Sequence, residues 1–273
     1  MIQQFRRFGA GLSDVTERWV PDAWVISMML TAVAILLCIF GAGATVEETV
    51  LAWGDGVWSL LGLAMQFTIA MVAAHACAAS PPIYRFFNWL ASLPNPSKPV
   101  QALVLAGMFS LVMGYLNWAV CLVSCALFTP FILRRNPNVD VRLLICASYL
   151  GIGTVWHGGL SGSAPLILAT PGNPLINPSS GAPIVDRLYP VTETLYNNFN
   201  LVFICILGAV ALATTCLLHP RSGARTLSAE EIEKILPTPP KEDGPPRTPA
   251  EYIDQFRGWV LLAVVLLAYP LGY

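Results

Sequence analysis

Residues 156–173 read WHGGLSGSAPLILATPGN, and this stretch guides the interpretation of the whole chain. It lies within an apolar run of the kind that crosses membranes. Yet it holds one histidine, two serines, one threonine, two prolines and four glycines. Irregular backbone at membrane depth is tolerated only where protein or a water-filled cavity surrounds it. The stretch therefore predicts a transmembrane helix that is broken where a small ligand binds.

The composition indicates a polytopic membrane protein. Apolar residues make up 55 % of the 273 residues, charged residues make up 11 %, and the mean hydropathy is +0.62. Several apolar runs of about 20 residues follow one another, and each can cross a hydrocarbon core of ~30 Å as a helix. We expect an all-α fold with about four transmembrane helices, a re-entrant hairpin, a broken helix and a further incomplete apolar segment.

Charge and cysteine content argue against several other kinds of partner. The net charge of −1 gives no field that favours nucleic acid. The seven cysteines fall in or beside apolar runs, without a CxxC pair or a Cys/His cluster. This pattern supports neither a metal site nor a disulfide framework. We therefore expect a lipid bilayer and a small molecule as partners, and no cofactor.

The apolar runs divide the chain into three parts. A membrane domain over residues 1–218 forms one structural repeat, a cytoplasmic linker covers 219–257, and 258–273 begin a further transmembrane segment. Ser228 and Glu231 predict a short capped helix in the linker. The repeat begins with an amphipathic lead-in over 1–22, which is either a surface helix or a solvated arm. A span over 23–44, a short acidic loop, a span over 57–79 and a proline-rich loop that cannot be one continuous helix follow. The repeat then continues with a re-entrant hairpin over 100–133, the broken helix over 141–170, an external loop and a span over 198–218.

The distribution of positive charge supports the hairpin. The run over 100–133 is too long for one crossing and too short for two, and Asn117 lies near its middle. Lysine and arginine concentrate in cytoplasmic loops. If the run returns to its own side, fourteen of the fifteen Lys and Arg residues share one face, and Arg187 is the exception. We therefore expect Asn117 at a hairpin tip, in a multi-pass protein of the cell inner membrane with a cytoplasmic N-terminus.

The break in the helix predicts binding of an anion. Free amides at the start of a half-helix attract a carboxylate, and unwound carbonyl groups hold a coupling cation. Pro165 suits the first turn of that half-helix. The predicted substrate-binding residues are Asn117, His157, Gly158, Gly159, Ser161, Gly162 and Ser163, and a second turn with Thr170, Gly172 and Asn173 is the candidate ion-binding position.

These residues also have structural interpretations. Glycine and serine in membrane helices often serve only close helix packing. His157 beside Trp156 is explained equally well by packing or by contact with the substrate. Gln66 either lines the cavity or bonds to a neighbouring helix. His75 is interpreted as an interior residue with its bonds satisfied, and His219 as part of a loop.

Three stretches resemble the short-chain fatty acid transporter family: WHGGLSGSAPLILATPGN, the upstream FSLVMGYLNWAVCLVSCAL and the opening FRRFGAGLSDVTERWVPDAWVISMMLT. The resemblance implies membership of a broad ion-transporter superfamily, with two repeated halves that often assemble as homodimers. It also implies ion-coupled symport of small carboxylates such as butyrate or acetoacetate across the plasma membrane. By position, Asn117 is then the hairpin tip, and Ser161, Gly162 and Ser163 form the break.

The chain departs from the family pattern in two places. Members of the family are longer, and TPAEYIDQFRGWVLL near the end of this chain looks like the opening of a second half. Members often carry histidine where this chain has Asn173. A non-transporting fragment of a carrier is therefore one alternative to a secondary transporter.

An intramembrane hydrolase that uses Ser161 or Ser163 with His157 is a further alternative. It is disfavoured because the chain has no GxSxG elbow and no acidic residue in its spans. No catalytic residue and no enzymatic activity are expected. The absence of buried acids favours Na⁺ as the coupling ion, whereas His157 as the titrating group would favour H⁺.

Overall fold

The computed structural model describes residues 2–78, 80–171, 184–185, 187–220, 222–237, 249 and 252. The chain divides into two compact units, Met1–Thr238 and Pro239–Tyr273. The regular elements of the described residues are helices, which confirms the all-α prediction. Five segments among them have the length and apolar character that a membrane crossing needs: Ala23–Gly41, Pro99–Leu116, Trp118–Arg135, Val141–Ala169 and Asn198–Leu218. The protein is thus an all-helical, multi-pass membrane protein.

The N-terminal helices follow the predicted order. The lead-in is a helix, α1 (Ile2–Trp19), and the first span is α2 (Ala23–Leu36), which continues as a π-helical turn to Gly41. Asp22 begins α2, because its carboxylate accepts a hydrogen bond from the Trp24 amide at 2.8 Å. The location of α1 at a membrane surface stays a prediction.

The expected acidic loop is a helix, so that interpretation was wrong. Helix α3 (Val46–Ser59) begins with a capping box, in which the Thr45 hydroxyl accepts from the Glu48 amide and the Glu48 carboxylate accepts from the Thr45 amide. This pairing satisfies two amides that otherwise lack partners at a helix start. Helix α4 (Leu61–Ala78) follows after Leu60 alone, within the predicted second span.

The proline-rich segment is not one continuous helix, as predicted. Helix α5 (Pro81–Leu90) begins with two prolines, and α6 (Pro99–Leu116) begins with another, where the missing proline N–H has no helical partner to lose. Helix α7 (Trp118–Arg135) then follows after Asn117. Helices α6 and α7 have 18 residues each, and each has the length and composition of a membrane crossing. The re-entrant character of this hairpin therefore stays a prediction.

The predicted broken helix is confirmed. Helix α8 (Val141–Gly153) ends at Thr154, a short 3-10 turn covers Trp156–Gly158, and α9 (Ser163–Ala169) resumes the helix. The sequence placed the start of the break near Gly158, whereas in the structure the break starts four residues earlier, at Thr154. Helix α10 (Asn198–Leu218) is the last span, and the capped linker helix is α11 (Ala229–Ile235).

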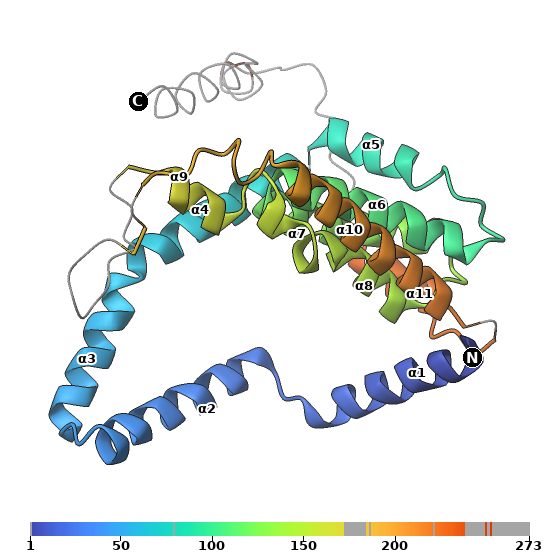
Figure 1. Ribbon diagram of the computed structural model, residues 1–273. Coiled ribbons are helices and arrows are strands. Elements are labelled where there is room, and N and C mark those ends of the chain that lie inside the picture. The colour runs from blue at the N-terminus through green and yellow to red at the C-terminus, as the bar shows by residue number, and fades with distance from the viewer. Residues whose placement is uncertain are drawn as a thin grey trace. The chain divides into compact units, whose positions relative to one another are not determined.

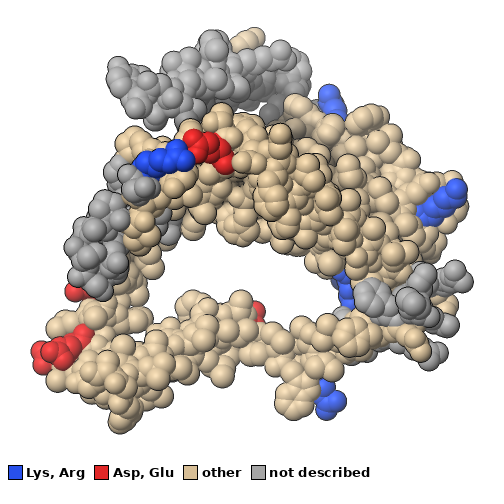
Figure 2. Space-filling model, viewed as in Figure 1, with Lys and Arg blue, Asp and Glu red and all other residues tan. Residues whose placement is uncertain are grey.

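Helices α6, α7 and α8 pack together, with α10 against α6 and α8 (Figure 1). Aromatic rings fill the centre of α5, α6 and α7, where the buried Phe87 ring lies 5.9 Å from Phe109 and 5.2 Å from Phe128. Helices α6 and α8 approach through small residues: a Cβ at Gly114 would lie 2.6 Å from the Gly151 carbonyl carbon. Charged side chains are sparse over the visible surface of the described residues (Figure 2), as expected for helices in lipid.

The first part of the linker packs on the membrane domain. Ile232 of α11 is 4 % exposed within the main core, and α11 contacts α7. Both His219 and Asp140 are buried, and the Asp140 amide donates to Nε2 of His219 at 3.2 Å. His219 follows the last residue of α10, in agreement with its assignment to a loop, and contacts the start of α8. The apolar segment predicted over 258–273 lies outside the described residues.

Candidate functional site

The tip of the α6–α7 hairpin meets the break between α8 and α9. The Leu160 amide donates to the Tyr115 carbonyl at 2.7 Å, and the Trp118 amide donates to the Ser161 hydroxyl oxygen at 3.0 Å. Both bonds join backbone at the hairpin turn to backbone or side chain at the break. The two irregular segments that the sequence singled out therefore lie against one another.

Two of the predicted glycines are required by close backbone contacts, Gly159 against the hairpin and Gly162 within the break itself. A Cβ at Gly159 would lie 2.5 Å from the Tyr115 carbonyl oxygen and 2.9 Å from the Tyr115 Cα. A Cβ at Gly162 would overlap the carbonyl oxygen of His157. Both obstacles are backbone atoms, which cannot turn away as a flexible side chain can. These glycines therefore have a packing role, whatever the ligand.

Ser161 lies at the centre of the junction. Its hydroxyl oxygen accepts the Trp118 amide, and its carbonyl accepts the indole N–H of Trp156 at 3.0 Å. Neither bond uses the hydroxyl hydrogen, and no described group accepts it. A serine hydroxyl can donate one bond while it accepts others. Within the described residues, Ser161 is therefore a positioned hydroxyl donor without an acceptor.

The start of α9 offers two further donors. No side chain caps this helix, and within the described residues no group accepts from the amides of Ser163 and Ala164. Pro165, in the first turn, has no amide hydrogen to offer. Because α9 has only seven residues, or about two turns, its dipole contributes less than the sequence interpretation assumed. Individual donors are the stronger basis for anion binding here.

Asn117 has a defined structural role at the hairpin tip. Its Oδ1 atom accepts from the amides of Ala119 at 3.0 Å and Val120 at 3.1 Å, and so caps the start of α7. The side chain is exposed, and its Nδ2 group has no partner among the described residues. The oxygen is thus committed to the helix, and only the amide donor is available to a ligand.

The remaining predicted residues lie around the junction. His157 is exposed, and its ring lies 4.3 Å from that of Trp156 between centroids. Ser163 is exposed at the start of α9. Thr170 ends α9, and its hydroxyl donates to the Leu166 carbonyl at 2.7 Å. The ion-binding candidates Gly172 and Asn173 lie outside the described residues.

Asn200 is a residue of the junction that the sequence interpretation missed. Its side-chain amide donates to the carbonyls of Gly158 at 3.0 Å and Leu195 at 2.8 Å. It thereby ties the start of α10 to the break, and a Cβ at Gly158 would lie 2.5 Å from its Oδ1. A polar residue near the start of an apolar span was the available signal, because such residues usually face protein rather than lipid.

Metal-ligating side chains do not cluster in the described part of the chain: no group of three or more His, Cys, Asp or Glu residues could hold an ion. Six cysteines with described side chains are free thiols. Cys121 and Cys125 are buried one helical turn apart on α7, with their sulfur atoms at 3.9 Å. The Cys121 sulfur also lies 3.8 Å from the Ser110 hydroxyl of α6, so the pair belongs to helix packing.

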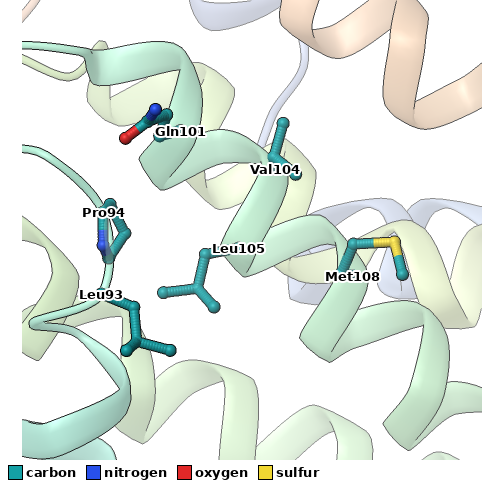
Figure 3. Close-up of a pocket in the computed structure, with 6 residues that line it drawn as sticks. All are labelled: Leu93, Pro94, Gln101, Val104, Leu105 and Met108. Carbon is teal, nitrogen blue, oxygen red and sulfur yellow. The ribbon is translucent and has the colours of Figure 1, made fainter.

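An open pocket of about 380 Å³ lies beside the first half of α6 (Figure 3). Its lining is mostly apolar, and its one amide side chain, Gln101, accepts a hydrogen bond from the Asn95 amide at 2.8 Å. None of the predicted site residues lines it; the lining residues are Leu93, Pro94, Gln101, Val104, Leu105 and Met108. This pocket is not the site at the hairpin tip.

Comparison with known proteins agrees with the resemblance in the sequence. A "Putative short-chain fatty acid transporter" of Escherichia coli K12 is 32 % identical over 280 residues, and the match covers 100 % of this chain and 58 % of that protein. A protein with the same name from Haemophilus influenzae is 31 % identical over 274 residues, again with 100 % and 58 % covered. The chain therefore spans somewhat over half the length of these relatives. No solved structure matches it. The family model described as short chain fatty acid transporter matches residues 4–267, and the chain belongs to this family.

Proposed function

We propose that the chain carries out uptake of short-chain fatty acids as a secondary transporter, coupled to an ion. Family membership supports the class of substrate, since the relatives are named for short-chain fatty acids. The junction of hairpin tip and broken helix supports the location of the site. Helices that are interrupted at membrane depth are typical of transporter substrate sites.

The observation that carries the proposal is the state of Ser161. Two hydrogen bonds hold this residue in place, from the Trp118 amide and the Trp156 indole, and its hydroxyl hydrogen remains without a described acceptor. A carboxylate binds through such preorganised donors with little loss of conformational entropy. The substrate carboxylate accepts from the Ser161 hydroxyl, and the amides of Ser163 and Ala164 and the Asn117 Nδ2 group are further donors.

The geometry gives little support to a hydrolase. Ser161 Oγ already accepts from a backbone amide, whereas a serine nucleophile needs a histidine base as its partner. His157 has ring contact with Trp156, and no hydrogen bond joins it to either serine among the described residues. The arrangement favours binding over acyl transfer.

The remaining parts of the proposal concern topology and coupling. Residues 1–218 form one structural repeat in the inner membrane, the N-terminus and the 219–257 linker are cytoplasmic, residues 258–273 begin a further span, and the protein assembles as a homodimer. Sodium, held by carbonyl and hydroxyl oxygens near the break, is the coupling ion, with Thr170, Gly172 and Asn173 as the candidate ion-binding residues. Proton coupling through His157 is the competing assignment.

Uptake of radiolabelled butyrate into proteoliposomes tests the proposal. The assay runs at alkaline pH, because the neutral acid crosses lipid unaided, and protein-free liposomes give the background. Saturable uptake that a Na⁺ gradient drives supports the proposal with sodium as coupling ion, and uptake driven by a pH gradient assigns coupling to protons. Absence of saturable uptake by the 273-residue chain overturns the proposal that it transports, and favours a non-transporting part of a carrier.

A further inference from the structure

We propose that the rings of Phe67 and Trp118 form an acyl-chain subsite that sets the chain-length preference of the carrier. This inference rests on the proposed function and assigns specificity to the side chains of Phe67 and Trp118, of which the proposal above uses only the Trp118 backbone amide. The carboxylate of the substrate sits at Ser161, and its hydrocarbon tail lies along these rings.

The rings form a connected series from three separate elements. Phe67 of α4 and Trp118 at the start of α7 lie 5.0 Å apart between centroids, at an interplanar angle of 85°. Trp118 and Trp156 of the 3-10 turn lie 6.3 Å apart at 50°. These separations are typical of aromatic pairs that attract one another. The series is therefore a preformed wall rather than a chance exposure of single rings.

The wall begins at the proposed carboxylate position. The Trp118 amide donates to the Ser161 hydroxyl oxygen, and the Trp156 indole donates to the Ser161 carbonyl. Both tryptophans are thus fixed to the residue that offers the free hydroxyl donor. The Trp156 ring is hydrogen-bonded directly to Ser161, so a carboxylate on the Ser161 hydroxyl lies at the start of the ring series. The Trp118 ring comes next in this series, and the Phe67 ring follows it.

Partial exposure leaves this wall open to a ligand. Phe67 is 44 % exposed, and the side chains of Trp118 and Trp156 are half-buried. Trp58 on α3, by contrast, is 71 % exposed and pairs with no other ring among the described residues. Lipid suffices to cover such isolated rings. The series at Ser161 joins an apolar wall to a hydroxyl donor, as a short fatty acid requires.

The edge-to-face contact at Phe67 gives the wall an end. With its plane at 85° to that of Trp118, the Phe67 ring stands across the path of a tail that runs along Trp118. A short tail lies along Trp118, and a longer tail meets the Phe67 ring. Since one methylene in an apolar site changes selectivity by about tenfold or more, this obstacle is sufficient to discriminate between acids.

Competition against radiolabelled butyrate uptake tests the subsite, with straight-chain acids from acetate to octanoate as competitors. In Phe67→Ala, removal of the ring is expected to increase competition by octanoate relative to acetate by roughly tenfold. Trp118→Leu removes the second ring, while the backbone bond from residue 118 to Ser161 persists. This change is expected to weaken competition by unlabelled butyrate relative to competition by acetate. Trp58→Ala is the matched control, with an unchanged profile.

The outcomes separate the two proposals. A shifted chain-length profile in Phe67→Ala and Trp118→Leu, against an unchanged Trp58→Ala, supports the subsite. Saturable butyrate uptake with the same profile in all variants overturns the subsite and leaves the transport function in place. Absence of saturable uptake in the unaltered protein overturns the transport function, and the subsite with it. If Phe67→Ala does not fold, Phe67→Leu, which keeps an apolar side chain of smaller reach, is expected to show the same shift.

Discussion

The backbone amide of Trp118 donates a hydrogen bond of 3.0 Å to the hydroxyl oxygen of Ser161, 43 residues further along the chain. This bond joins the start of α7 to the break in the α8–α9 helix. Together with the bond from Leu160 to Tyr115, it couples the position of the hairpin tip to that of the break.

Gly159→Ala is expected to destabilise the junction and reduce uptake. Its Cβ would lie 2.5 Å from the Tyr115 carbonyl oxygen, and overpacking of this kind costs about 1–3 kcal/mol. Gly153→Ala, where a Cβ meets nothing within 4 Å, is the control. Thermal unfolding in detergent is the measurement. Equal melting temperatures for the two variants would contradict the close approach of hairpin and break.

Ser110→Ala is expected to weaken the packing of α6 on α8. The fully buried Ser110 hydroxyl donates to the Ser148 carbonyl at 2.7 Å and accepts from the Gly151 amide at 2.9 Å. Loss of a buried partner costs about 1–3 kcal/mol. In the control Ser27→Ala, the exposed hydroxyl bonds only within its own helix, and the free energy of unfolding should hardly change. A large effect at Ser27, or none at Ser110, in denaturant unfolding would refute this assignment.

Asp140→Asn is expected to loosen the attachment of the linker at Arg225. The buried carboxylate uses Oδ1 to accept from the amides of Arg142 and Leu143, and Oδ2 to accept from the amide of Arg225. Asparagine has one acceptor oxygen, so it can keep the helix cap or the linker bond, but not both. Faster hydrogen exchange at the Arg225 amide is the expected result.

Asp22→Asn is the matched control for that change. Asp22 also caps a helix, but it is exposed and accepts only from the Trp24 amide at 2.8 Å, and asparagine is as good a cap as aspartate. In Asp22→Asn, hydrogen exchange at the Arg225 amide should stay unchanged. Unchanged exchange in Asp140→Asn as well would mean that the carboxylate does not hold the linker.

Acid is expected to loosen α11. Hydrogen bonds from the Ser228 amide and then from its hydroxyl lower the pKa of Glu231. A carboxyl whose pKa is lowered by folding stabilises the fold above its unfolded pKa, and this contribution is lost as the pH falls through the folded pKa. Exchange protection of α11 should therefore drop at acidic pH. Glu231→Gln should remove this pH dependence, whereas Glu233→Gln should retain it; equal behaviour of the two variants would argue against the capping box.

Local patterns in the sequence predicted the elements of the candidate site. Glycine, serine and proline at 158–165 break a helix wherever they occur, and Asn117 is a good cap between two apolar helices. Ser228 and Glu231 likewise predicted the start of α11. The same capping pattern at Thr45 and Glu48 was missed because the segment was assigned as a loop from its acidic residues.

Contacts between distant segments had no such local pattern. The burial of Ile232 depends on packing against α7, about a hundred residues earlier, and the partner of the His219 ring is the amide of Asp140. Side-chain periodicity describes which face of a helix is apolar, but not which other segment covers it. The role of Asn200 was missed for the same reason, since its acceptor at Gly158 exists only once the break has formed.

Butyrate uptake by Ser161→Ala, measured beside Ser27→Ala, tests the central claim that the substrate carboxylate binds at the break. The alanine leaves the Trp118 amide without its acceptor and removes the free hydroxyl donor. A hydrogen bond to a charged group contributes about 1.5–3 kcal/mol, which corresponds to a loss of roughly tenfold to a hundredfold in affinity. At equal amounts of protein in the liposomes, the account predicts that saturable uptake falls at least roughly tenfold in Ser161→Ala. Uptake by Ser27→Ala is predicted to equal that of the unaltered protein. Equal uptake by the two variants would contradict it and place the substrate elsewhere.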